Sequence, residues 1–95
     1  MTALELILQE RLRQISMLGY TPEHDDEHLA GEIASAAADY ALPGQHPVPS
    51  SWAAGKAKDS RIEQLAKAGA LIIAEIDRLQ RLEHPSRVAN TGDVG

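Results

Sequence analysis

The chain has 95 residues, a formal net charge of −5 and no cysteine. This length corresponds to one domain, and the lack of cysteine excludes disulfides, thiolate metal sites and a cysteine nucleophile. The negative charge argues against general binding to nucleic acid, and no apolar run approaches the ~20 residues of a membrane span. The N-terminus lacks a basic region followed by an apolar block, so we expect a cytoplasmic protein without a signal peptide.

The first expected helix runs from about Thr2 to Leu18. Its apolar residues recur at steps of three and four, which is the spacing of one helix face, and we expect this face to meet the core. The residues of the face are Leu4, Leu8, Leu12 and Ile15. Gly19 suits the left-handed cap that ends a helix. The dipeptide Thr21-Pro22 then predicts a turn.

A second helix is expected to begin at Asp25 or Asp26, with an aspartate as its N-cap, and to continue to about Leu42. Small side chains line one side of this helix, so a neighbouring helix can approach closely. They are Ala30, Ala34, Ala37 and Ala41. Pro43-Gly44 ends the helix and opens a long loop over 43–57.

The third helix is expected to run from Asp59 or Ser60 to about Glu83, and Ser60 with Glu63 fits the capping-box pattern. Its expected buried stripe consists of Ile62, Leu65, Gly69, Ile72, Ile76 and Leu79. Residues 84–95 carry few apolar side chains and are predicted to be a loosely ordered tail. The predicted fold is all-α, a small three-helix domain over 1–83 with a long proline-containing loop between the second and third helices.

Large apolar side chains are scarce, because the chain has no phenylalanine, one tryptophan and two tyrosines. A core made mostly of alanine is thin, and thin cores are often supplemented by self-association. Leu6, Ile7 and Ile73 lie off the main stripes, and apolar surface beyond one stripe needs another partner. We therefore expect a homo-oligomer.

The segment from Gly19 to His28 concentrates histidines and acids directly after a turn. If a helix begins near Asp25, then Asp25, His28 and Glu32 project from one face. Imidazole with carboxylate suits Zn²⁺, Mn²⁺ or Fe²⁺, and Glu75 on the third helix could complete such a divalent metal site. The same residues would also serve a polar ligand, or would form an exposed acidic helix start with nothing bound.

A second candidate site lies at the end of the long loop, where Trp52 precedes Lys56 and Lys58. An aromatic plane beside ammonium groups suits a nucleotide, with stacking on the base and charge on the phosphate. Trp52 could instead pack over the core. We expect this loop and the start of the second helix to converge on one pocket. Its expected ligand-binding residues are Tyr20, His24, Asp25, Asp26, His28, Trp52, Lys56 and Lys58.

Two stretches are informative in combination. They are Gly19-Tyr20-Thr21-Pro22-Glu23-His24-Asp25-Asp26 with His28, and Lys67-Ala68-Gly69-Ala70-Leu71-Ile72 with Ala74-Glu75-Ile76. Together they resemble a family of small proteins encoded by phages and prophages, over about residues 11–81. Gly55 and Ala57 stand where that family has a tryptophan and a proline, which favours a pocket completed by a second subunit. The resemblance implies a phage gene acting in the cytoplasm of an infected bacterium, and it names no activity.

Three hypotheses follow from these features. The first is a binding protein for a small anionic ligand of nucleotide type. It would have an anti-defence role similar to that of viral sponges, which sequester nucleotide signals of bacterial immunity without turnover. The second is a metal-dependent enzyme resembling all-α nucleotide pyrophosphohydrolases, although the Glu-Glu-x-x-Glu pattern of that family is absent. The third is a structural or partner-binding helical protein. We favour the first.

Overall fold

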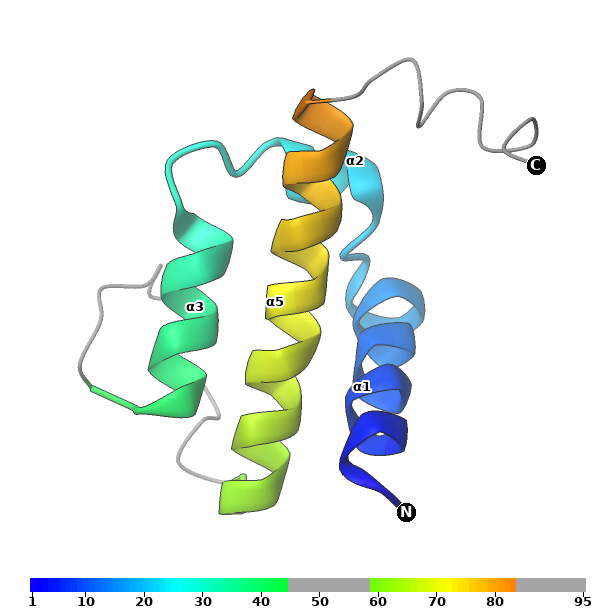
Figure 1. Cartoon of the computed structure of the whole chain (residues 1–95), viewed down its shortest axis with the longest axis vertical. Helices are drawn as coiled ribbons and strands as arrows, with labels where there is room; N and C mark the ends of the chain where they lie inside the picture. The colour runs from blue at the N-terminus through cyan, green and yellow to red at the C-terminus, as the bar shows by residue number, and fades with distance from the viewer. Residues whose placement is uncertain (45–58, 84–95) are drawn as a thin grey trace.

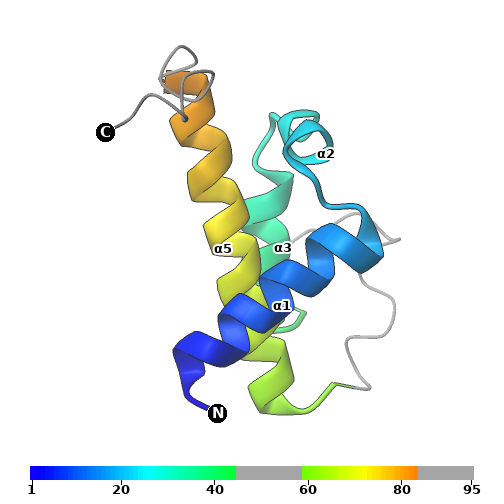
Figure 2. The same ribbon diagram turned by 90° about the vertical axis from the view of Figure 1, so that its right-hand side faces the viewer.

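The computed structural model describes residues 1–44 and 59–83, which form four helices: α1 (Ala3–Leu18), α2 (Pro22–Asp26), α3 (Glu32–Ala41) and α5 (Arg61–Glu83). No strand occurs within these two ranges, so the predicted all-α class is confirmed. The long helix α5 runs through the middle of the molecule, with α3 on one side and α1 on the other (Figure 1). Figure 2 shows α1 crossing α5 at an angle. Within the described ranges, no helix combines the length and the apolar character that crossing a membrane requires.

Local capping explains where α1 begins and ends. The hydroxyl of Thr2 accepts a hydrogen bond from the backbone N–H of Glu5 at 3.2 Å. The Glu5 carboxylate in turn accepts from the N–H of Thr2 at 2.8 Å, which completes a capping box. At the other end Gly19 adopts φ of +74°, a left-handed conformation that glycine reaches at little cost. The predicted bounds of the first helix are therefore confirmed.

The predicted helix over 25–42 is two helices, so this part of the prediction is wrong. Thr21 rather than an aspartate caps α2, because its hydroxyl accepts from the N–H of His24 at 3.3 Å. Pro22 occupies the first helical position, where its missing N–H is not needed. The helix α2 ends at Asp26, and α3 begins only after Gly31, which has φ of +83°. That left-handed residue interrupts the helical path and turns α3 away from α2.

The prediction for the third helix is confirmed closely by α5. The hydroxyl of Ser60 accepts from the N–H of Glu63 at 3.1 Å, as expected for a cap at this position. The helix then continues to Glu83. Most of the predicted loop, residues 45–57, and the whole predicted tail, residues 84–95, lie outside the described residues.

The core lies between α3 and α5 and is built largely from alanine. Its buried residues are Ile33, Ala36, Ala37, Leu71 and Ala74. Small side chains let two helices approach closely, which offsets part of the low apolar area. The helix α1 packs elsewhere on α5, where Ile7 rests on Gly69. A Cβ atom at Gly69 would lie 2.9 Å from Cδ1 of Ile7, so this crossing requires glycine or a shift of Ile7.

The two strongest apolar stripes face outward, which corrects the sequence prediction. The α1 stripe, 36–76% exposed, consists of Leu4, Leu8, Leu12 and Ile15. The α5 stripe, 40–50% exposed, consists of Leu65, Ile72, Ile76 and Leu79, and Ile62 is more exposed still. Conversely, three residues that were expected to lie off the core are partly buried: Leu6, Ile7 and Ile73. In the predicted alanine stripe, only Ala37 is buried. The chain thus turns an alanine-rich surface inward and leaves its larger aliphatic side chains outside.

Candidate functional site

A buried ion pair fastens α2 to α1. Asp25 is 2% exposed and Arg11 is 6% exposed. Nη2 of Arg11 lies 3.1 Å from Oδ2 of Asp25, and Nη1 of Arg11 donates to the carbonyl oxygen of Tyr20 at 3.3 Å. The carboxylate and the guanidinium compensate each other, because an uncompensated charge inside a protein is strongly unfavourable. Asp25 therefore orders the turn between α1 and α2 rather than forming part of an exposed helix start.

Two histidines form a chain with the neighbouring carboxylates. Nδ1 of His24 lies 3.0 Å from Oδ1 of Asp25, and Nδ1 of His28 lies 3.4 Å from Oε2 of Glu32. An ionised carboxylate only accepts hydrogen bonds, so each contact places a proton on Nδ1 of the histidine. The two Nε2 atoms then face each other at 3.4 Å. Tyr20 stacks on the His24 ring with 4.7 Å between centroids and 12° between planes.

The predicted metal face does not form. The four candidate ligands were Asp25, His28, Glu32 and Glu75. Because α2 ends at Asp26, the residues before and after it do not share one helix face. Glu75 accepts from Nε of Arg78 at 2.6 Å, and Asp26 accepts from Nη2 of Arg81 at 2.7 Å. Within the described parts of the chain, no group of three or more histidine and acidic side chains could hold a metal ion.

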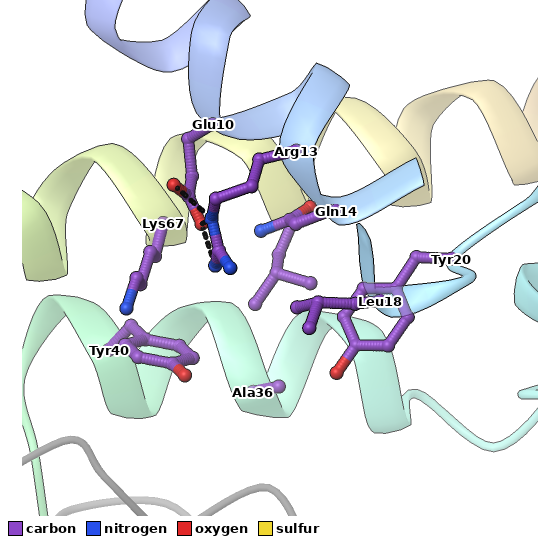
Figure 3. Close-up of a pocket in the computed structure, with 9 residues that line it drawn as sticks. Glu10, Arg13, Gln14, Leu18, Tyr20, Ala36, Tyr40 and Lys67 are labelled. Carbon is purple, nitrogen blue, oxygen red and sulfur yellow. Dashed lines mark hydrogen bonds and ion pairs between the residues drawn. The ribbon is translucent and has the colours of Figure 1, made fainter. Parts of the chain in front are cut away.

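A narrow cleft opens where α1, α3 and α5 meet, and we call it the tyrosine cleft. Its lining residues are Glu10, Arg13, Gln14, Leu18, Tyr20, Ala36, Tyr40, Lys67 and Leu71. Figure 3 shows the two tyrosine rings at opposite ends of this group, with Arg13 and Gln14 between them and Lys67 directed toward Tyr40. Burial raises the pKa of both Tyr20 and Tyr40, because the phenolate form loses solvation there.

Both cations of the tyrosine cleft are held by carboxylates. Arg13 donates through Nε to Glu10 at 2.9 Å, and this hydrogen bonding raises the pKa of Arg13. Nζ of Lys67 donates to Asp59 at 2.8 Å and lies 5.9 Å from the centroid of the Tyr40 ring. A cation near an aromatic face is attracted by the ring quadrupole. The cleft therefore presents two oriented positive groups beside an aromatic wall.

The amide of Gln14 is the unexplained polar group of the tyrosine cleft. Gln14 is 2% exposed, and its Oε1 has no hydrogen-bond partner among the described residues. A buried polar atom without a partner costs about 1–3 kcal/mol, and almost all such atoms in folded proteins are satisfied by protein, water or a ligand. Gln14 Oε1 therefore needs a partner from outside the described residues, either a water molecule or a ligand.

Tyr20 links this cleft to the residues singled out in the sequence. It lines the cleft and also stacks on His24, so the start of α2 adjoins the cleft. Trp52, Lys56 and Lys58 lie outside the described residues, and their convergence with α2 stays a prediction.

Sequence reasoning missed six polar residues of this region: Glu10, Arg11, Arg13, Gln14, Tyr40 and Lys67. Arg11 and Gln14 follow Ile7 at steps of four and three, so the spacing carried a signal. It was outweighed by the stronger stripe of leucines on the other side of α1.

Comparisons with protein-family models, with curated proteins and with solved structures gave no match to this chain.

Proposed function

We propose that the protein binds a small anionic ligand of nucleotide type and holds it without turnover. The observation that carries the proposal is the buried amide of Gln14, which lines the tyrosine cleft and whose oxygen has no partner among the described residues. Ligand sites combine apolar and aromatic walls with a few well-placed polar groups, and this cleft has both.

Each part of the tyrosine cleft has a counterpart in a nucleotide. The rings of Tyr20 and Tyr40 offer surfaces for stacking a base. The Gln14 amide suits the hydrogen-bonding edge of a base, and the ammonium of Lys67 and the guanidinium of Arg13 suit phosphate oxygens. Glu10 at the same cleft can accept from sugar hydroxyls. The cleft has a volume of only about 30 Å³, close to that of one water molecule, so a nucleotide can enter it only if Tyr20 and Tyr40 move apart.

Retention without turnover is favoured over hydrolysis because the acids are neutralised. A metal-dependent pyrophosphohydrolase needs carboxylates directed at Mg²⁺. Here Asp25 pairs with Arg11, Asp26 pairs with Arg81, and Glu75 pairs with Arg78. Because these three carboxylates are paired with arginines, they do not form the metal-binding array that such an enzyme requires.

Self-association belongs to the same proposal. The α1 stripe and the α5 stripe place eight aliphatic side chains, each at least 36% exposed, on two helices that pack together. Exposed apolar patches of this kind mark interaction sites, and a second copy of the chain carries the same stripes in a self-complementary form. We propose a homo-oligomer in which these stripes are covered.

The biological role that we propose is sequestration of a nucleotide signal of bacterial immunity. It is supported by the resemblance of residues 11–81 to small phage proteins and by a cleft with groups for base and phosphate. In this role the protein acts in the cytoplasm of an infected bacterium and needs only to bind.

Calorimetry with a panel of nucleoside monophosphates, diphosphates and dinucleotides tests the proposal. Gln14→Leu removes the amide while keeping a similar volume, so we expect affinity to fall roughly ten- to a hundredfold. The same change removes an unsatisfied buried oxygen, so stability should stay constant or rise by about 1 kcal/mol. Gln80→Leu, at an exposed glutamine of α5, is the control and should change neither. Equal affinity of Gln14→Leu and wild type would show that the amide faces water rather than a ligand.

A further inference from the structure

His24 in α2 and His28 just after α2 form a pair whose geometry the proposed nucleotide binding does not use. Both rings hold a proton on Nδ1 because each Nδ1 faces a carboxylate, Asp25 for His24 and Glu32 for His28. The two Nε2 atoms lie 3.4 Å apart, so one ion can contact both of them.

A tetrahedral transition-metal ion fits that position. A zinc–imidazole bond is about 2.0–2.1 Å, so two nitrogens on one tetrahedral Zn²⁺ lie about 3.3–3.4 Å apart. The observed separation of His24 and His28 is 3.4 Å. The rings are oriented edge to face, with 4.8 Å between centroids and 61° between planes. Both side chains remain 22–28% exposed, so an ion can reach them from solvent.

The carboxylates complete the pattern of a metal site. Metal-binding histidines almost always donate their other ring N–H to a carboxylate or a carbonyl, which fixes the tautomer and makes the ligand more basic. Asp25 is anchored by Arg11 at 3.1 Å, and Glu32 accepts from the N–H of Ala30 at 2.6 Å. Hydrogen bonding to its own backbone N–H, and then to that of Ala30, lowers the pKa of Glu32. Each histidine therefore has a carboxylate partner that is itself held in place.

We propose that His24 and His28 form a two-histidine site for a transition-metal ion of the Zn²⁺ class, bound through their Nε2 atoms. The remaining coordination positions are open to water or to an oxygen atom of a small anion. Mg²⁺ is excluded from the site, because it demands oxygen ligands. The inference does not rest on ligand binding in the tyrosine cleft, although Tyr20 lines that cleft and stacks on His24.

Zinc titration of the chelator-treated full chain tests this inference by calorimetry, with Mg²⁺ in parallel. Wild type should bind one Zn²⁺ per chain and no Mg²⁺. His24→Ala and His28→Ala should each weaken Zn²⁺ binding at least about tenfold, and Glu32→Gln should weaken it about tenfold through loss of the supporting carboxylate. Glu23→Gln, an exposed acid next to His24, is the matched control and should leave binding unchanged.

Nitrogen NMR of the histidine rings gives a second readout that does not depend on affinity. Zinc should shift the Nε2 resonances of His24 and His28 while both Nδ1 atoms stay protonated. His28→Gln serves in place of the alanine variant if circular dichroism shows that the latter has lost helix. The inference is overturned if Zn²⁺ binds equally well without either histidine, if Glu23→Gln loses as much affinity as the histidine variants, or if coordination runs through Nδ1.

Discussion

Replacing Asp25 with alanine removes the acceptor of the buried Arg11 guanidinium. Arg11 is only 6% exposed and would keep a single hydrogen bond, to the carbonyl oxygen of Tyr20 at 3.3 Å. Breaking a buried ion pair on one side costs about 3–5 kcal/mol, chiefly because the other charge stays buried without compensation. A chain of 95 residues has a free energy of unfolding of about 5–14 kcal/mol, so the substitution should remove a large share of it.

The neighbouring Asp26 provides a matched control on the same helix. It also pairs with an arginine, Arg81, at 2.7 Å, but the Asp26 side chain is 50% exposed. Exposed ion pairs contribute about 0–1 kcal/mol, so Asp26→Ala should lie close to wild type. Urea unfolding followed by circular dichroism measures both variants, at one fixed chain concentration because self-association would add to the apparent stability.

A third variant separates loss of the pair from loss of a side chain. Adding Arg11→Met to Asp25→Ala removes both charges and keeps an apolar stem in the buried position. Replacing a whole buried ion pair by apolar groups is often neutral, so the double variant should be more stable than Asp25→Ala alone. Equal effects of Asp25→Ala and Asp26→Ala, or a double variant weaker than Asp25→Ala, would refute the assignment of Asp25 as the anchor of α2.

Three further predictions concern packing, self-association and ionisation. Gly69→Ala gains about 1 kcal/mol of helix propensity but crowds Ile7, at a cost of about 1–3 kcal/mol, so unfolding assays should show a net loss of about 0–2 kcal/mol. In an Ile7→Ala background the same change should stabilise by about 1 kcal/mol, and an unchanged sign would contradict the contact. Ile76→Glu should reduce the molar mass seen by light scattering without loss of helix. Leu29→Glu, at a residue that is 71% exposed and outside both stripes, should leave the molar mass unchanged. A wild-type monomer would rule out the oligomer. Both tyrosines should form phenolate above the ordinary pKa of about 10, because burial raises the pKa of each. The stability that the neutral tyrosines contribute is present below about pH 10 and is lost as pH rises through the folded pKa values. If ultraviolet absorbance showed both tyrosines titrating at or below the ordinary pKa, the predicted rise in pKa would be contradicted.

The helices that could be predicted from sequence are those with local caps. Thr2 with Glu5 and Gly19 mark the ends of α1, and Ser60 marks the start of α5, because capping depends on residues within one turn. The break between α2 and α3 was not predictable in the same way. The residues on either side of Gly31 are compatible with a continuous helix. The left-handed φ of +83° at Gly31 depends on how α2 packs against the rest of the chain.

Burial was predicted least well, for a physical reason. Apolar periodicity shows which side chains should leave water, but it does not show whether the same chain or another copy covers them. The leucines of the α1 stripe are more regular than the inward face that carries Ile7, Arg11 and Gln14. The pairing of Arg11 with Asp25, 14 residues apart, likewise depends on the turn at Gly19 and on α2. Tyr20 and His24 were singled out from sequence because their motif is local, and their role as ligand-binding residues stays a prediction.

Mass spectrometry of small molecules released from the purified full chain tests the central claim most directly. The chain is incubated with an extract of bacterial nucleotides, washed, and denatured by heat. Binding without turnover predicts that an intact nucleotide is recovered from wild type and is depleted from Gln14→Leu, with Gln80→Leu equal to wild type. Recovery of hydrolysed products would instead favour the metal-dependent enzyme, and recovery of no nucleotide would favour a structural helical protein; either result would contradict the account.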